Sequence, residues 1–143
     1  MTTATDRNLK MKHRSREITE GPDRAPARSY LWAMGLKQED MDKPFIAIAN
    51  LASDVTPCNV HLDRFAQAAK EGIRQAEGTP FEFGTITVSD GISMGTEGMK
   101  ASLVSREVIA DSIEVVAFGE RMDALIAVAG CDKNMPGCLM AMA

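Results

Sequence analysis

The chain has 143 residues, of which 45% are hydrophobic and 25% charged, and its net charge is −4. These values are ordinary for a globular domain with a core, so a largely disordered chain is excluded. Nothing indicates the basic face that nucleic-acid binding requires, and no apolar stretch approaches the length of a membrane span. Residues 1–13 are polar and lack the apolar segment of a secretion signal, so we expect a flexible tail and a cytoplasmic protein.

The first predicted elements are a helix, a strand and a second helix. Residues Asp23–Met34 are expected to form a short helix that its first residue caps and Gly35 terminates. The apolar run Phe45–Ala49 is typical of a buried strand. From His61 to Glu77, apolar residues recur three, four and seven positions apart, which predicts one face of a helix that Gly78 ends.

The alternation of strands and helices continues to the end of the sequence. Phe81–Val88 is rich in residues that favour β-structure, and a glycine-rich loop follows it. Ser102–Phe118 has apolar residues at helical spacing, and Ala124–Ala129 predicts a third strand. A last helix is expected to begin at Asn134, which we interpret as its cap, with Pro136 in its first turn.

This order of elements predicts the fold class. Strands that alternate with helices and are apolar throughout indicate a parallel sheet covered on both faces. We therefore expect an α/β fold, a three-layer sandwich with a mostly parallel sheet. The sequence stops at CLMAMA, inside the last predicted helix and without a cap, so we interpret residues 14–143 as a truncated part of a larger N-terminal domain. A complete small domain with a frayed end is the alternative.

Reactive side chains follow each predicted strand. Cys58 follows the first strand, Asp90 the second, and Cys131, Asp132 and Lys133 the third. Because ligands of parallel α/β sheets bind at the carboxyl ends of the strands, these residues are expected to share one rim. Thiolates suit iron–sulfur clusters and soft metals, whereas carboxylates suit magnesium or manganese. No CxxC, GxGxxG or P-loop motif is present, so zinc-ribbon and nucleotide-binding interpretations are weak.

The cysteines and His61 also have plainer interpretations. A free cysteine is often a small buried apolar residue, so both interpretations stay open for Cys58 and Cys131. Cys138 lies about one turn into the last predicted helix, among leucine and methionine, which favours the core. For His61 a structural role is favoured, because a lone histidine makes a poor metal site.

Lys133 has two competing interpretations. Spacing alone favours an ordinary ion pair with Asp90 or Asp132. Partial burial beside a helix start would instead lower the pKa of the amine and favour its neutral form. A neutral amine can react with carbon dioxide to give a carbamate, which is an anionic oxygen ligand suited to magnesium.

Three stretches carry a specific resemblance to a known family. They are TPCNVHLDR (Thr56–Arg64), EFGTITVSDGISMGTEGMKASLVSREVIADSIE (Glu82–Glu114) and GCDKNMPG (Gly130–Gly137). On these stretches the sequence strongly resembles the dihydroxy-acid dehydratase and phosphogluconate dehydratase family, and the resemblance runs from about Arg14 to the last residue.

The resemblance implies a ligand set. Cys58 and Cys131 match two of the family's three cluster cysteines, Asp90 and Asp132 match magnesium ligands, and Lys133 matches the lysine whose carbamate binds the magnesium. The implied cofactors are Mg²⁺ and an iron–sulfur cluster, either [2Fe–2S] or [4Fe–4S].

Other functional residues of the family have no counterpart in this sequence. The third cysteine, a glutamate ligand and the serine proposed as catalytic base lie further along in the family, so the resemblance places them beyond Ala143. No catalytic residue is therefore assigned within the 143 residues.

The resemblance also implies an activity. The stretch SDGISMGTEGM is similar to that of the branched-chain amino-acid enzymes of the family. The implied hydro-lyase converts 2,3-dihydroxy-3-methylbutanoate and its 3-methylpentanoate homologue to 2-keto acids in isoleucine and valine biosynthesis, as part of a longer chain. We expect these 143 residues alone to be inactive, and the full-length protein to form a homodimer or a dimer of dimers without nucleic acid or membrane partners. A sugar-acid dehydratase of the same family and a non-catalytic fragment are the alternatives.

Overall fold

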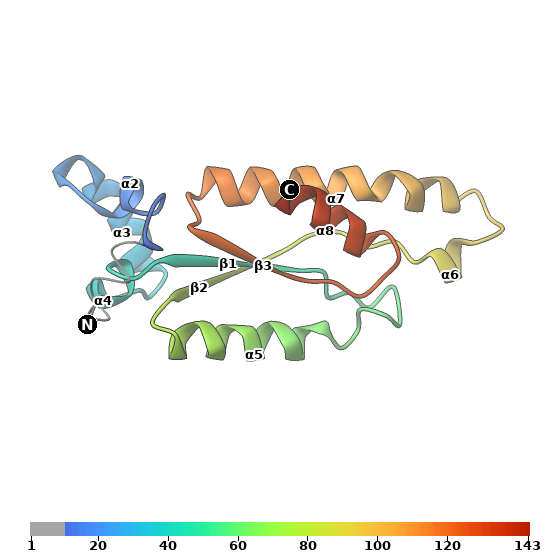
Figure 1. Ribbon diagram of the computed structural model, residues 1–143, viewed down its shortest axis with the longest axis horizontal. Coiled ribbons are helices and arrows are strands. Elements are labelled where there is room, and N and C mark those ends of the chain that lie inside the picture. The colour runs from blue at the N-terminus through green and yellow to red at the C-terminus, as the bar shows by residue number, and fades with distance from the viewer. Residues whose placement is uncertain (1–10) are drawn as a thin grey trace.

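The computed structural model describes residues 11–143, and its centre is a sheet of three parallel strands (Figure 1). The strands are β1 (Phe45–Asn50), β2 (Thr79–Gly84) and β3 (Ala124–Val128), in the order β2-β1-β3. The register pairs Phe45 with Thr79 and Ile46 with Ala124. Because β1 has a neighbour on each side and helices on both faces, its side chains are the most buried, which explains its unbroken apolar sequence.

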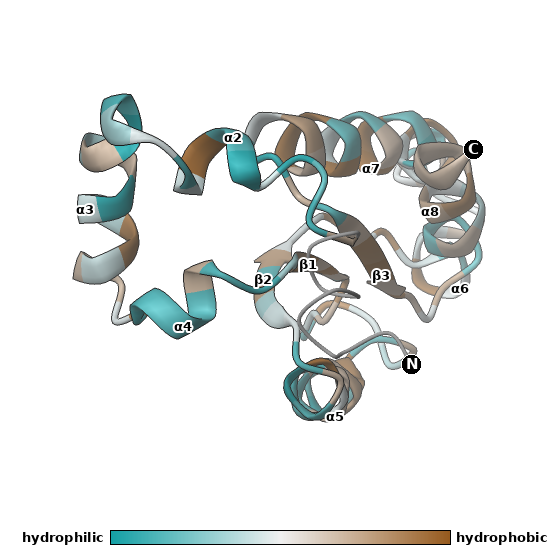
Figure 2. Cartoon of the chain, turned by 60° about the vertical axis from the view of Figure 1, so that its left-hand side comes forward, coloured by the Kyte–Doolittle hydropathy of each residue, from teal (hydrophilic) through white to brown (hydrophobic). Residues whose placement is uncertain are grey.

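Helices cover both faces of this sheet. Figure 1 shows α5 (Leu62–Gln75) on one face and α7 (Met99–Gly119) with α8 (Asn134–Met142) on the other, and Figure 2 shows the same layers from a second side. The shorter helices are α2 (Arg16–Thr19), η1 (Pro22–Arg24), α3 (Ala25–Ala33), α4 (Gln38–Met41) and α6 (Asp90–Ser93). The expected α/β fold with a parallel sheet between two helical layers is confirmed. Among residues 11–143, no helix combines the length and apolar character needed to cross a membrane.

The main hydrophobic core lies between the sheet and its helices. Ile48 of β1, Leu62 and Ile73 of α5, and Ile109 and Ile113 of α7 belong to one buried cluster, together with other buried residues of β1, β3 and α8. The helices α7 and α8 approach closely, because a Cβ atom at Gly137 of α8 would lie 2.9 Å from the Arg106 carbonyl oxygen of α7. The core therefore fixes where α8 begins, and with it the loop after β3.

Three helices end in the same hydrogen-bonded motif. The residue after each C-cap has a positive φ: Gly35 at 94°, Glu77 at 63° and Arg121 at 53°. Gly35 thus ends α3 as predicted. At the end of α5, however, Glu77 and not Gly78 adopts the left-handed conformation, and the Gly78 amide closes the motif by donating to the Ile73 carbonyl (2.9 Å). Gly78 is needed for space, because a Cβ there would lie 2.9 Å from the Ile73 side chain.

Three local predictions were wrong in detail. Strand β2 ends at Gly84 and not at Val88, because its partner β1 ends at Asn50, which pairs with Gly84. Asp23 forms no cap, since it lies within η1 and α3 begins without a side-chain cap. Asn134 is the first residue of α8 and not its cap, because its side chain is buried in contacts with other loops.

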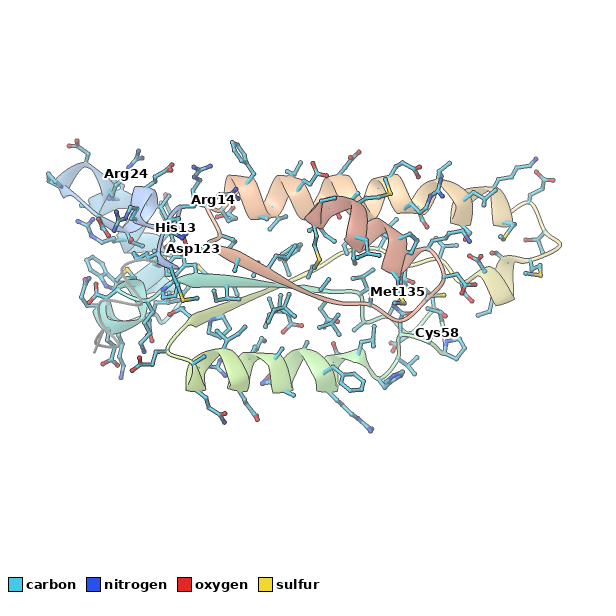
Figure 3. The ribbon with its side chains drawn as sticks, viewed as in Figure 1. His13, Arg14, Arg24, Cys58, Asp123 and Met135 are labelled. Carbon is cyan, nitrogen blue, oxygen red and sulfur yellow. The ribbon has the colours of Figure 1, made fainter. Side chains whose placement is uncertain are left out.

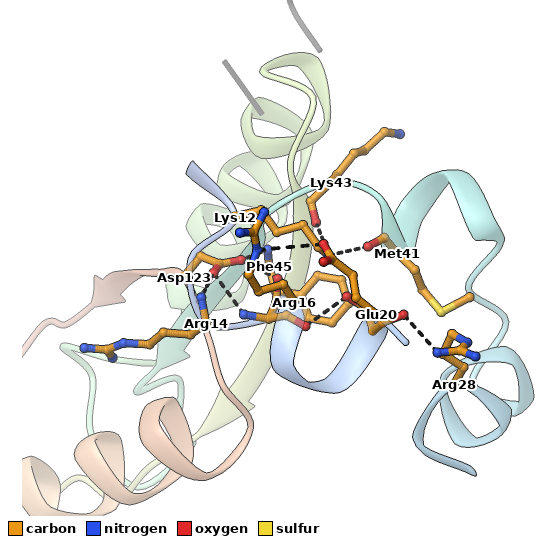
Figure 4. Close-up of polar contacts among 11 residues, drawn as sticks. Lys12, Arg14, Arg16, Glu20, Arg28, Met41, Lys43, Phe45 and Asp123 are labelled. Carbon is orange, nitrogen blue, oxygen red and sulfur yellow. Dashed lines mark hydrogen bonds and ion pairs between the residues drawn. The ribbon is translucent and has the colours of Figure 1, made fainter. Parts of the chain in front are cut away.

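Residues 12–15 are anchored at the amino end of the sheet (Figure 4). The Asp123 carboxylate accepts hydrogen bonds from the Arg14 and Ser15 amides (2.7 and 3.0 Å), the Ser15 hydroxyl (2.6 Å) and the Phe45 amide (2.8 Å). Lys12 is buried, and its ammonium donates to the carbonyl of the last residue of α4. Burial lowers the pKa of Lys12, against the opposing charge of Asp123. Of the predicted tail, residues 1–10 lie outside the described residues, whereas Lys12 belongs to the folded chain.

Candidate functional site

The loops after the three strands meet at the carboxyl edge of the sheet. A Cβ atom at Gly130, after β3, would lie 2.4 Å from the carbonyl oxygen of Cys58, after β1. The Cys131 sulfur lies 3.9 Å from the carbonyl oxygen of Val88, after β2. Figure 3 places Cys58 at this edge and Asp123 at the opposite end of the sheet. The topology therefore brings the loops that carry the predicted site residues together.

Asp90 is a buried acidic group at this edge. It is the first residue of α6, where the Ser89 side chain accepts a hydrogen bond from the Ile92 amide (3.3 Å). The Asp90 carboxylate accepts hydrogen bonds from the Lys133 ammonium (2.5 Å) and from the Ser102 hydroxyl. The Lys133 contact, followed by that of Ser102, lowers the pKa of Asp90. Asp90 is thus held as an oriented carboxylate at neutral pH.

The pairing of Lys133 with Asp90 is the arrangement that spacing alone favoured. Lys133 is partly buried, and it precedes α8. Asp132 is exposed and directly precedes Lys133 in the chain. Of the three residues predicted to hold magnesium, Asp90 and Lys133 are in contact, and Asp132 adjoins Lys133 in the sequence.

The three cysteines occupy three different environments. All of them are free thiols: Cys58 is exposed, Cys131 is 7% exposed at the edge, and Cys138 is 4% exposed in the core. Burial raises the pKa of the Cys138 thiol, which agrees with the core interpretation of this residue. Cys58 and Cys131 lie on the two loops that touch at Gly130. His61 is exposed, and the centroid of its ring lies 5.7 Å from that of the next aromatic ring in α5, in an edge-on contact.

The donor set fits the implied cofactors as a partial ligand set. Within residues 11–143, no three His, Cys, Asp or Glu side chains gather as a metal site. The oxygen donors for a divalent cation are the carboxylates of Asp90 and Asp132, to which a carbamate on Lys133 would add a third. Two thiols, those of Cys58 and Cys131, are available for a cluster. The chemistry of these donors suits magnesium and iron–sulfur ligation.

The ligands and the base expected beyond Ala143 are not part of the described edge. Helix α8 ends at Met142, and the amide of the exposed Ala143 donates to the Leu139 carbonyl (3.1 Å). The third cysteine, the glutamate ligand and the serine base that the resemblance places beyond Ala143 therefore stay predictions. Among residues 11–143, no side chain is assigned as the catalytic base.

Sequence reasoning did not predict the contacts of four polar residues that organise this edge. Ser102 of α7 holds Asp90 from twelve residues away. The side chains of Asn59, Thr87 and Asn134 form a buried network among the three loops. Neither hydrogen-bond partners nor burial of these residues can be read from spacing. Their only local signal is position, since two of them directly follow proposed ligands in the sequence.

The fold and this edge define an α/β protein whose candidate ligand site lies at the carboxyl ends of parallel strands. A family model described as the N-terminal part of dihydroxy-acid/6-phosphogluconate dehydratase matches residues 43–143. The chain belongs to this family.

Curated relatives agree with this membership. A dihydroxy-acid dehydratase of Natronomonas pharaonis is 68% identical over 128 residues, which are 90% of this chain and 22% of that protein. A second, of Haloarcula marismortui, is 63% identical over 128 residues with the same coverage. A third, of Koribacter versatilis, is 58% identical over 138 residues, 96% of this chain and 24% of that protein. The chain thus spans about a quarter or less of the length of these relatives.

Proposed function

We propose that the complete gene product dehydrates 2,3-dihydroxy-3-methylbutanoate and its 3-methylpentanoate homologue to 2-keto acids, a step of isoleucine and valine synthesis. In this reaction the C2 proton leaves, the C3–oxygen bond breaks to release water, and the resulting enol tautomerises to the keto acid. Support comes from relatives named dihydroxy-acid dehydratase and from the edge where Asp90 meets Lys133 near two free cysteines. The meeting of the three loops that carry these residues, at one edge of the sheet, is the observation that carries the proposal.

The residues of this chain have distinct tasks in the proposed reaction. The carboxylate of Asp132 and the buried Asp90, with carbamylated Lys133, would hold magnesium, and the thiols of Cys58 and Cys131 would be ligands of the cluster. When bound, these groups supply Lewis acidity for the substrate carboxylate and for its C2 and C3 hydroxyls. A serine hydroxyl of α7 orients the Asp90 carboxylate, and burial of Asp90 keeps bulk water from one side of the site.

The expected setting of the protein follows from the same proposal. Three free cysteines suit a reducing compartment, so we place the protein in the cytoplasm. We expect a homodimer or a dimer of dimers that acts on a small dihydroxy acid. A sugar-acid dehydratase of the same family is the second candidate, because the family model covers both kinds of enzyme.

The test is 2-keto acid formation by the complete gene product, purified without oxygen and assayed with magnesium. The informative variant is Lys133→Arg, because arginine keeps the positive charge beside Asp90 but cannot form a carbamate. We expect this variant to lose at least about 100-fold in kcat, since a metal ligand is removed. Lys100→Arg is the matched control, because Lys100 is exposed and its ion pair is with the likewise exposed Glu97, away from the proposed ligands. Normal turnover by Lys133→Arg would contradict the carbamate, and turnover of sugar acids alone would favour the second candidate.

A further inference from the structure

One side-chain oxygen joins the loops that follow the three strands. The Asn134 Oδ1 atom accepts hydrogen bonds from the Asn59 Nδ2 atom (2.8 Å) and from the Thr87 hydroxyl (3.0 Å). Asn59 belongs to the loop after β1, Thr87 to the loop after β2, and Asn134 begins α8 after β3. Asn59 and Asn134 are both fully buried. We call these three residues the amide latch.

Each residue of the amide latch is covalently close to a residue of the proposed site. Asn59 directly follows the first cluster cysteine, Asn134 directly follows Lys133, and Thr87 precedes Asp90 by three positions. The backbone adds a further link, because the Asn134 amide donates to the carbonyl of the second cluster cysteine (3.0 Å). A change in the latch therefore shifts the thiols, the carboxylate and the lysine relative to one another.

Stability alone does not account for two buried carboxamides at this place. The Asn59 Oδ1 and Asn134 Nδ2 atoms are buried and have no partner among the side chains and backbone of the described residues. Apolar residues of similar shape would avoid the desolvation of these polar atoms. Directional hydrogen bonds, in contrast to apolar contacts, specify one relative position of the segments they connect. The latch is thus better suited to fixing geometry than to adding stability.

We propose that the Asn134 carboxamide is a positioning group, which holds the loops of Cys58 and Asp90 in register with residues 131–133. The identity of the reaction it serves rests on the proposed function, but its first test does not. The discriminating variant is Thr87→Val, which removes one donor of the latch without changing the side-chain volume much. Thr85→Val is the matched control, because Thr85 lies two residues away and pairs with a serine of α7 (2.6 Å), outside the latch.

The first test measures thiol alkylation of the complete gene product after removal of its metals, resolved by peptide. Cys58 is exposed and Cys138 lies in the core, so they serve as internal references for open and globally protected thiols. We expect Thr87→Val to raise the alkylation rate of Cys131 about three- to tenfold, the effect of one lost hydrogen bond on loop opening. Thr87→Ser should restore the original rate, and Thr85→Val should leave it unchanged.

The second test compares kcat of the metal-loaded variants. Thr87→Val is expected to lower kcat about tenfold or more at unchanged iron content and melting temperature, because small displacements of reacting groups are costly. A rate of Cys131 alkylation that stays constant, or that rises together with the rate of Cys138, overturns the proposal. Equal kcat in Thr87→Val and Thr85→Val also overturns it. If the unaltered protein has no dehydratase activity, the proposed function fails, while the alkylation rates still decide on the latch.

Discussion

Replacing Gly130 by alanine is expected to disrupt the edge of the sheet where the proposed ligands lie. The added Cβ would lie 2.4 Å from the Cys58 carbonyl oxygen and 3.3 Å from a methyl group of Leu62. Ordinary contacts between carbon and carbonyl oxygen are about 3.3–3.6 Å, so the Cys58 loop must move by about 1 Å. Because the obstacle is backbone, no side-chain rotation can relieve the clash.

Two consequences of Gly130→Ala are measurable. Overpacking of this kind destabilises by about 1–3 kcal/mol, which should lower the melting temperature of the complete gene product. A displacement of about 1 Å in a catalytic site costs about 100-fold in rate, so kcat/KM for dihydroxy-acid dehydration should fall by about that factor. Thermal melting and 2-keto acid formation, measured on the same anaerobic preparation, give both numbers.

Two other glycines provide controls for this experiment. Gly119, the last residue of α7, has nothing within 4 Å of an added Cβ, so Gly119→Ala should leave stability and rate almost unchanged. Gly137→Ala meets the Arg106 carbonyl at 2.9 Å and should destabilise through the contact of α7 with α8. If Gly130→Ala behaves like Gly119→Ala, the close approach of the two loops is refuted. If the rate of Gly130→Ala per folded molecule falls no more than that of Gly137→Ala, the link between the close contact of the two loops and catalysis is refuted.

Two further predictions concern the stability of the fold. Asp123→Ala leaves the partly buried amides of Ser15 and Phe45 without an acceptor, so it should cost about 2–4 kcal/mol relative to Asp111→Ala at an exposed position. Burial raises the pKa of Asp123, but hydrogen bonds led by those of Ser15 lower it below its usual value. The stability difference between Asp123→Ala and Asp111→Ala should therefore be constant above about pH 5 and shrink as the pH falls below about 4. A difference in melting temperature that grows in acid would contradict this assignment. Ile109→Ala removes a fully buried side chain of α7 and should cost about 2–5 kcal/mol in thermal or chemical unfolding. Val108→Ala, at the neighbouring half-exposed position, should change the free energy of unfolding by no more than about 0.5 kcal/mol. Equal effects of the two substitutions would show that the burial of Ile109 is wrong.

Local patterns in the sequence were enough to predict the architecture. The spacing of apolar residues and the positions of glycines involve residues only a few places apart. The run Phe45–Ala49 therefore predicted β1, and the helical spacing in Ser102–Phe118 predicted the body of α7. The parallel arrangement then implied that Cys58, Asp90 and Cys131 would lie on neighbouring loops. The extent of β2 was not predictable in this way, because the end of its partner β1 decides where pairing stops.

The sequence by itself determined the alternation of strands and helices, the family, and the residue types at the carboxyl edge. Only the tertiary structure decided which of these residues touch. Lys133 contacts Asp90 across a sequence separation of 43 residues. The two carboxamides of the latch are 75 residues apart in the sequence, and Ser15 and Asp123 are 108 residues apart. Such contacts depend on strand order and on the rotation of α7 and α8 against the sheet, which packing in the whole core sets. No spacing within a loop carries that information.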